Sequence, residues 1–230
     1  MKKNKELAIF LPLRAGSERV INKNTKKISK YNYGLLELKL NQLINLDKNI
    51  EIVVSTNDKK VLDFLNSNNK FKSIIVDNRP DNLCNSQTNL EDLIRYVPQI
   101  IFKKHILWTH VTSPFVETKD YELVIQKYFD LNEHDSLISC EPINEFIWNS
   151  QTRKLINVPE FIKWPRTQDI EGLYKINNAI FINSRANYLK HQNRIGILPF
   201  FYTMDKYKSI DIDDEYDFKF AEILLNSNLL

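Results

Sequence analysis

The residues best suited to chemistry form a cluster of cations directly after a short apolar run near the start of the chain. The run 7–13 ends at Arg14-Ala-Gly-Ser17, and Arg19, Lys23, Lys26 and Lys27 follow with almost no negative charge beside them. A strand that ends in a Gly/Ser turn and then cations is how an α/β protein holds a polyphosphate. An ordinary strand-to-loop transition with solvated lysines is the other interpretation. The spacing fits neither a Walker A loop nor a G-x-G-x-x-G dinucleotide turn.

Two carboxylates near the other end of the chain form a second candidate feature. In an extended segment, Asp211 and Asp213 point the same way, while Ile210 and Ile212 enter the core. Paired hard oxygen ligands suit Mg²⁺, which commonly takes one or two carboxylates together with substrate phosphates and water. Alternatively, the acidic residues 213–215 favour the positive end of the last helix. The cationic loop at the other end of the chain favours the metal interpretation.

Other polar side chains stand where strands are expected to end. Arg79, followed by Pro80, could reach a nucleotide or a phosphate, although a surface arginine is the commoner case. His110, Thr112 and Ser113 supply hydrogen-bonding groups at the carboxyl end of a strand, where α/β sheets bind ligands. His110 invites a role as general base, and a hydrogen-bonded loop histidine is the alternative.

Composition limits the class of protein. A chain of 230 residues with a formal net charge of +3 suits one domain with a continuous core and argues against a dedicated nucleic-acid binder. It contains no apolar run that could span a bilayer and no signal peptide, so no membrane partner is expected. Cys84 and Cys140 have no C-x-x-C partner, so we expect a cytoplasmic, reducing location.

Short apolar runs alternate with amphipathic stretches, which predicts an α/β protein with a mostly parallel sheet. The expected strands are 7–13, 51–55, 73–76, 105–109, 136–139 and 178–183. The expected helices are 35–46, 59–66, 89–97, 121–131, 185–191 and 215–225. Thr88 and Glu91 predict a capping box at the start of the third helix.

Residues 141–173 interrupt this alternation, because prolines and aromatic residues are scattered there through irregular polar sequence. Such a segment either packs on another subunit or closes over a substrate, and we favour an arm that forms a homodimer. Within it, Arg166 and Gln168 stand beside Trp164 and suit a ligand that carries a carboxylate. The expected organisation is a single domain, 1–230, with this arm inserted.

Taken together, these blocks resemble the acylneuraminate cytidylyltransferases, which are the CMP-sialic acid synthetases and their relatives that activate other ulosonic acids. The resemblance covers nearly the whole chain in the right order. It is carried by residues 13–24, 54–58, Arg79-Pro80 with Leu83, Thr112-Ser-Pro114, 165–168, 176–183 and 209–213. Most of these motifs are weak singly, whereas their occurrence together and in order is strong.

The resemblance implies a Rossmann-like, three-layer nucleotidyltransferase fold with a protruding dimerisation arm. It implies transfer of CMP from CTP to the anomeric hydroxyl of a sialic-acid-like sugar acid, with release of pyrophosphate. Mg²⁺ would bind Asp211 and Asp213, and the catalytic residues would be Lys23, Arg14 and Asp211. The implied nucleotide-binding residues are Leu13, Arg14, Ala15, Gly16, Ser17, Lys23, Asn24, Arg79 and Ser86. The implied acceptor-binding residues are His110, Thr112, Ser113, Arg166, Gln168 and Asn177, with Arg166 acting on the neighbouring subunit.

The departures from the family matter most at the acceptor end. Where the family has Gln-Pro-Thr-Ser-Pro-Leu-Arg, this chain has His110-Val-Thr-Ser-Pro-Phe-Val116, and the lost Gln and Arg lie on the acid-sugar side. Ser86 replaces an aspartate, Asn178 a glycine, and Glu18-Arg19 a Lys/Gln-Gly pair. The resemblance therefore supports cytidylyl transfer more than N-acetylneuraminate as the acceptor. A different acidic acceptor, such as 3-deoxy-manno-octulosonate or a non-sugar acid, and a catalytically silent nucleotide-binding homologue stay open.

Overall fold

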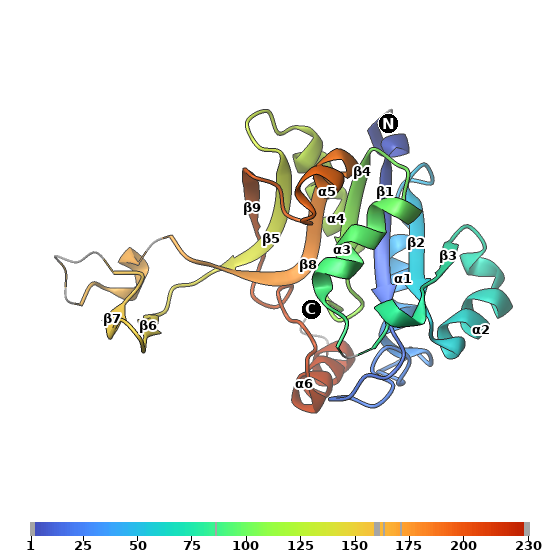
Figure 1. Cartoon of the computed structure of the whole chain (residues 1–230). Helices are drawn as coiled ribbons and strands as arrows, with labels where there is room; N and C mark the ends of the chain where they lie inside the picture. The colour runs from blue at the N-terminus through green and yellow to red at the C-terminus, as the bar shows by residue number, and fades with distance from the viewer. Residues whose placement is uncertain (1–2, 86, 159–161, 163, 171, 228–230) are drawn as a thin grey trace.

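A central sheet organises the computed structural model, which describes residues 3–85, 87–158, 162, 164–170 and 172–227. The sheet strands are β1 Leu7–Leu13, β2 Glu51–Thr56, β3 Ile75–Asn78, β4 His105–Thr109, β5 Ser136–Pro142, β8 Tyr174–Ser184 and β9 Pro199–Thr203. In the part of the chain that the structure describes, seven strands lie in the order β3-β2-β1-β4-β8-β5-β9 (Figure 1). Strand β8 is antiparallel to both of its neighbours, and the other neighbouring pairs are parallel. The sheet is therefore mixed but mostly parallel, as the sequence predicts.

The central strand β1 is apolar along its whole length, and six of its seven residues are buried. It pairs in parallel with β2 on one side and β4 on the other, so helices must cover both of its faces. A strand buried on both faces is a continuous apolar run rather than an alternating one. Because the chain moves outward from β1 to β2 and β3 and then returns to β4, the strand order reverses at β1. Such a reversal leaves a binding crevice outside the carboxyl ends of β1 and β4.

Helices lie on both faces of the sheet and give the molecule three layers. Their bounds are α1 Gly34–Leu43, α2 Lys59–Ser67, α3 Leu90–Ile100, α4 Thr118–Phe129, α5 Arg185–His191 and α6 Glu215–Asn226. Helices α1, α2, α4 and α6 share one core with Leu7, Ile9 and Leu11 of β1. Helices α3 and α5 pack with Ala8 and Phe10 on the opposite face, as the twofold period of a strand requires. Among the described helices, none is long and apolar enough to cross a membrane.

Gly34 fixes the point at which the long loop after β1 enters α1. Its φ is +57°, and a Cβ at this position would lie 2.1 Å from the carbonyl oxygen of Lys26. Glycine avoids both the left-handed backbone penalty and this collision. The tight contact holds residues 14–33 against the carboxyl end of the sheet, beside α6 (Figure 1).

Most of the predicted elements are present with shifted ends, one strand was not predicted, and one prediction is wrong. The sequence pattern did not indicate β9, because this edge strand begins with proline and its residues are exposed or half-buried. The capping box predicted at Thr88 is wrong. Helix α3 begins at Leu90, and the side chain of Asn89 caps it by accepting a hydrogen bond from the Glu91 amide. The Thr88 hydroxyl instead donates to the carbonyl oxygen of Asn82.

The segment between β5 and β8 leaves the sheet and projects away from the three layers (Figure 1). It carries a small hairpin formed by β6 Trp148–Asn149 and β7 Lys154–Leu155. The Asn157 side chain ties the hairpin base by bonding the Ile147 amide and the Glu145 carbonyl, at 3.1 and 2.6 Å. Trp148 is 61% exposed and Trp164 is 74% exposed. The projection begins and ends close to the bounds of the predicted arm, 141–173.

Candidate active site

A pocket of about 440 Å³ opens at the carboxyl ends of β1 and β4. The loop after β1 contributes Arg14, Ser17 and Lys23 to its lining, together with Leu13 and Asn24. The loop after β4 contributes His110 and Thr112, and Asp213 comes from the segment before α6. Three segments far apart in the sequence therefore meet around one pocket at the reversal of the strand order.

The loop after β1 is held in shape by its own polar groups. The Ala15 amide donates to the side-chain oxygen of Asn57 at 3.0 Å, and the Asn24 side chain donates to the Arg14 carbonyl at 3.1 Å. The guanidinium of Arg14 donates to the Gly16 carbonyl at 3.1 Å. Gly16 has a φ of +75°, in the left-handed region that favours glycine. These contacts bend the chain so that cationic side chains line the pocket.

Lys23 lies between this loop and the carboxyl-terminal segment. Its ammonium group donates to the carbonyl oxygen of Ile212 at 2.7 Å. Burial lowers the pKa of Lys23, and the charges of Asp213 and Asp211 act in the opposite direction. A partly buried ammonium group close to Asp211 and Asp213 is suited to neutralising an anion that enters the pocket.

Two ion pairs fasten the loop after β1 to the start of α6. Arg19 contacts Asp213 at 2.8 Å, and Lys26 contacts Glu215 at 2.9 Å. The side chains of Arg19 and Asp213 are 66% and 56% exposed, so the pair contributes little to stability. Its consequence is positional, because it keeps the Asp213 carboxylate beside the cationic loop.

Asp211 is the more buried of the two predicted metal ligands. Burial raises its pKa, as does the charge of Asp213, while hydrogen bonds from the side chains of Thr112 and Asn178 lower it. The Asn178 amide donates to the Asp211 carboxylate at 3.3 Å. Ile212 between the two aspartates is fully buried and its amide donates to the Thr112 carbonyl at 2.9 Å, which anchors the pair at the pocket edge.

This pair fits Mg²⁺ as a two-carboxylate site that substrate phosphates and water would complete. No group of three or more His, Cys, Asp or Glu side chains suited to a metal occurs in the described part of the chain. A site built from protein ligands alone is therefore not formed by these residues. The donor set agrees with a metal that arrives with a polyphosphate.

Arg79 is buried, in contrast to the surface position that is commoner for arginine. Its guanidinium donates to the hydroxyl and the carbonyl of Ser55, at 3.1 and 2.5 Å, and to the Leu13 carbonyl at 3.4 Å. The Ser55 hydroxyl donates in turn to Asp77 at 2.6 Å. Burial lowers the pKa of Arg79. Arg79 therefore joins the ends of β1 and β2 directly beneath the pocket.

His110 is a hydrogen-bonded loop histidine in this structure. The indole N–H of Trp108 donates to His110 Nε2 at 2.9 Å. Burial and then the nearby charge of Arg194 lower the pKa of His110 to about 3. The imidazole is therefore neutral at ordinary pH, with its proton on Nδ1. The favoured role is hydrogen-bond donation, because Nε2 already accepts a bond.

The loop after β4 rests on a buried lysine that the sequence analysis missed. The ammonium group of Lys39 donates to the carbonyl oxygens of Ser113 and Val116 and to the Tyr121 hydroxyl. Burial lowers the pKa of Lys39 to about 7. Ser113, predicted to bind the acceptor, is fully buried, and its hydroxyl has no hydrogen-bond partner among the described residues. A polar residue inside the leucine-rich stretch 35–46 is the signal that could have identified Lys39.

Asn177, also predicted to bind the acceptor, lies below the pocket rather than in its wall. It is 2% exposed, and its amide oxygen accepts from the Ser139 hydroxyl at 2.6 Å. Its amide nitrogen donates to the Ser209 hydroxyl at 3.1 Å. In this arrangement Asn177 ties β8 to β5 and to the segment that carries Asp211.

Two of the remaining predicted residues, Arg166 and Gln168, do not line the pocket within one chain. Arg166 and Gln168 lie in the projecting arm, where Arg166 pairs with Asp169 at 2.8 and 3.1 Å (Figure 1). Ser86 lies outside the described residues. A further arginine, Arg194, lies near His110, and nothing in its sequence surroundings indicated a role.

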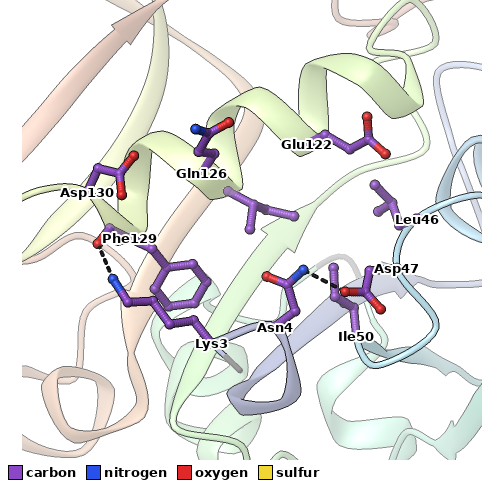
Figure 2. A pocket seen from close by; sticks show the side chains of 10 residues that line it. Lys3, Asn4, Leu46, Asp47, Ile50, Glu122, Gln126, Phe129 and Asp130 are labelled. Carbon is purple, nitrogen blue, oxygen red and sulfur yellow. Dashed lines mark hydrogen bonds between the residues drawn. The ribbon is translucent and has the colours of Figure 1, made fainter. Parts of the chain in front are cut away.

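A second cavity, of about 450 Å³, lies at the opposite end of the strands, beside the amino ends of β1 and β2 (Figure 2). Lys3 donates to the Phe129 carbonyl, and Asn4 donates to Asp47, both at 2.8 Å. These contacts close the first turn of the chain against α4 and the loop after α1. None of the described residues predicted for the site lines this cavity. This cavity has a volume similar to that of the pocket at the carboxyl ends of β1 and β4, but it is the weaker candidate for the active site.

The comparisons with known proteins agree with the position of the site. A family model described as Cytidylyltransferase matches residues 8–226, and the chain belongs to this family. The N-acylneuraminate cytidylyltransferase of Escherichia coli O18:K1:H7 is 23% identical in an alignment 227 residues long that covers 94% of this chain and 51% of that protein. The N-acylneuraminate cytidylyltransferase of Streptococcus agalactiae serotype III is 24% identical over 148 residues, 63% of this chain and 36% of that protein. The chain thus spans about half the length of the E. coli relative, and less of the streptococcal one.

Solved structures show the same fold at low identity. CMP:2-keto-3-deoxy-manno-octonic acid synthetase complexed with CTP matches with a TM-score of 0.67 at 16% identity, covering 95% of this chain and 98% of that one. The 4-diphosphocytidyl-2C-methyl-D-erythritol synthase of Anaerococcus prevotii matches with a TM-score of 0.68 at 12% identity, covering 96% and 98%. These likenesses establish the nucleotidyltransferase fold and leave the acceptor undetermined.

Proposed function

We propose that this chain transfers CMP from CTP to the anomeric hydroxyl of a sialic-acid-like sugar acid and releases pyrophosphate. One observation carries the proposal most directly. The cationic loop after β1 and Asp213 line the same pocket, although they come from opposite ends of the chain, and the Lys23 ammonium group bonds the carbonyl of Ile212, the residue between Asp211 and Asp213. A nucleoside triphosphate needs both features, because its phosphates are bound by cations and by the metal that accompanies them.

In this proposal, the protein contributes positioning and charge neutralisation more than covalent chemistry. The acceptor oxygen forms a bond to the α-phosphorus of CTP as the bond from that phosphorus to pyrophosphate breaks, and the hydroxyl proton is released. Lys23 and Arg14 neutralise the negative charge that develops on pyrophosphate. Arg79 keeps the strand ends beneath the nucleotide in place. Mg²⁺, when bound, would supply further neutralisation of the phosphate oxygens at Asp211 and Asp213.

The acceptor is the part of the proposal for which the chain departs from its relatives. The curated relatives named above favour a sialic-acid-like acid, and the likeness to the octonic acid synthetase supports a different ulosonic acid as the second candidate. His110 and the buried Ser113 occupy the loop expected on the acceptor side. Product analysis separates the candidates. Incubation with CTP, Mg²⁺ and one acid at a time should yield a CMP-linked acid together with pyrophosphate for one of them. Binding of CTP without product from any acid would support the catalytically silent alternative.

The arm that includes β6 and β7 completes the acceptor side in a homodimer, according to this proposal. Exposed Trp148 and Trp164, together with the projection of the arm away from its own sheet, support a contact with a second copy (Figure 1). Arg166 would then reach the partner's pocket. Mixing Arg166→Met chains with chains that carry Asp211→Asn tests this, because one pocket of each mixed dimer regains both residues and should recover activity. A monomeric mass in solution, with full activity, would contradict it.

A further inference from the structure

Arg194 is a half-buried cation beside β4 and β8, close to His110 of the pocket wall. It follows α5, and its guanidinium lies 3.8 Å from the ring centroid of Phe181 and 5.3 Å from that of Trp108. Trp108 and Phe181 are paired across β4 and β8 and are both buried. The aromatic faces therefore hold the guanidinium near the carboxyl end of β4, beside His110, which follows that strand, and Asn178, which lies within β8.

The charge of Arg194 lacks a counter-ion in the described part of the chain. Its one side-chain hydrogen bond there runs to the Asn178 side-chain oxygen at 3.4 Å, which is a long, neutral contact. Burial lowers the pKa of Arg194, and the phenol of Tyr188 is the group that acts against this change. The Tyr188 hydroxyl is itself buried, with no hydrogen-bond partner among the described residues. A desolvated cation without an anion is costly, unless a ligand supplies the anion.

The groups around Arg194 offer donors to such a ligand. His110 is neutral, because burial and the charge of Arg194 lower its pKa to about 3. Its Nε2 accepts from Trp108, so Nδ1 carries the proton and can donate. His110 also lines the pocket, whereas Asn178 links Arg194 to Asp211. A guanidinium and an imidazole N–H beside the proposed metal ligand form a donor set for a carboxylate.

We propose that Arg194 binds the carboxylate of the acidic acceptor, with His110 as a second, uncharged donor. This inference rests on the proposed function and names the residue that selects for an acid. It differs from assigning that role to Arg166, which already pairs with Asp169 and lies in the exposed arm. Arg194 supplies a cation on the acceptor side, where the chain lacks the arginine of the family motif at Val116.

The test compares Arg194→Met and Arg194→Lys with wild-type protein. The readouts are KM for CTP, kcat/KM for the most active sugar acid and for its methyl ester, and the melting temperature. Arg194→Met should lower kcat/KM for the acid about 100-fold and leave KM for CTP within about threefold. The preference for the acid over the ester should disappear, and Arg194→Lys should recover part of it. The melting temperature should stay equal or rise, because a partly buried charge without a counter-ion is removed.

Arg185→Met is the matched control for a purely structural arginine. Arg185 lies at the start of α5, where it stacks on Phe102 and donates to the Pro98 and Ile101 carbonyls. Its loss should lower the melting temperature and leave acceptor kinetics unchanged. If Arg194→Met behaves like this control, with the preference for the acid intact, the inference is overturned.

Binding measurements separate this inference from the proposed function. Calorimetric titration of N-acetylneuraminate and 3-deoxy-manno-octulosonate into the protein without CTP needs no turnover. If the wild type forms no product but binds one acid, and Arg194→Met loses that binding, the transfer reaction fails and the inference stands. Equal binding of both acids by wild type and variant, or binding of neither acid by the wild type, overturns the inference even if transfer occurs.

Discussion

The two halves of the pocket are built in different ways. The half proposed to bind the nucleotide comes mainly from one continuous stretch, 13–24, whose backbone and side chains bond to one another. The half proposed to bind the acceptor is assembled from the loop after β4, Asn178 of β8 and the loop after α5, and it depends on the buried Lys39 and the half-buried Arg194. A binding loop formed by one continuous stretch keeps its side chains in place when other parts of the chain are substituted. A pocket wall formed by several separate segments can have single residues substituted, which agrees with the differences from the family motif at His110 and Val116.

The largest effect is expected for the residue that both halves share. Asp211→Asn removes a charge from the segment between them, and the rate of pyrophosphate release should fall roughly 10²–10³-fold. The fold should survive, because burial already disfavours the charged carboxylate, as its raised pKa shows. Steady-state kinetics at saturating Mg²⁺ measure the fall in rate, and a thermal melt measures whether the fold survives. A near-normal rate would exclude the metal assignment of Asp211.

Lys23→Met tests the nucleotide half alone. It removes the ammonium group beside Ile212, and kcat/KM for CTP should fall about 100-fold with little change in KM for the acid. Lys27→Met is the matched control, because Lys27 belongs to the same loop but is exposed. The proposed role of Lys23 does not hold if both variants lose the same amount of activity.

Lys39 offers a test of the acceptor half through pH. The pKa of Lys39 is lowered to about 7, against an ordinary value of 10.5, so from pH 7 to 10 the unfolded chain holds a proton that the folded chain has lost. Raising the pH in this range therefore stabilises the folded state, by up to ~1.4 kcal/mol per pH unit. The slope should be absent from Lys39→Met, measured as the difference between the two proteins in urea unfolding at each pH. Parallel pH profiles would show that Lys39 does not titrate in this way.

The smallest effect is expected for the exposed pair between Arg19 and Asp213. Arg19→Gln should change stability by no more than about 0.5 kcal/mol and kcat by less than about threefold, because both side chains are largely exposed to solvent. Urea unfolding and pyrophosphate release are sufficient to measure this. A large loss of activity would show that Arg19 binds the phosphates directly and does not only position Asp213.

Local sequence patterns located the loop after β1 in the pocket wall better than they located the residues on the β4 and β8 side, for a physical reason. Residues 13–24 are adjacent in the chain, so their local pattern predicts a loop of cations at a strand end, and the structure has this loop. Arg194 acquires its neighbours only through the register of β4 with β8, in which Trp108 pairs with Phe181. Local patterns carry no information on that register. The predicted capping residue at Thr88 failed similarly, because Asn89 competes for the same helix end.

The bounds of the buried strands were predicted better than the edge strand and the side-chain contacts. β1 and β4 were located with their observed bounds, because both are apolar runs between polar segments. β9 lacks that contrast, since it lies at the edge of the sheet with much of its surface exposed. Asn177 was placed with the acceptor residues on sequence grounds, whereas its amide groups bond to Ser139 and Ser209. Its role in binding an acceptor stays a prediction.

The most direct test of the central claim is pyrophosphate release by the wild-type protein with Mg²⁺, comparing CTP with ATP, GTP and UTP. The acids to be supplied are N-acetylneuraminate, legionaminate, pseudaminate and 3-deoxy-manno-octulosonate. The account predicts Mg²⁺-dependent release with CTP and one of these acids, and little or none with the other nucleotides. Tight binding of CTP without release from any acid, or equal release with ATP, would contradict it.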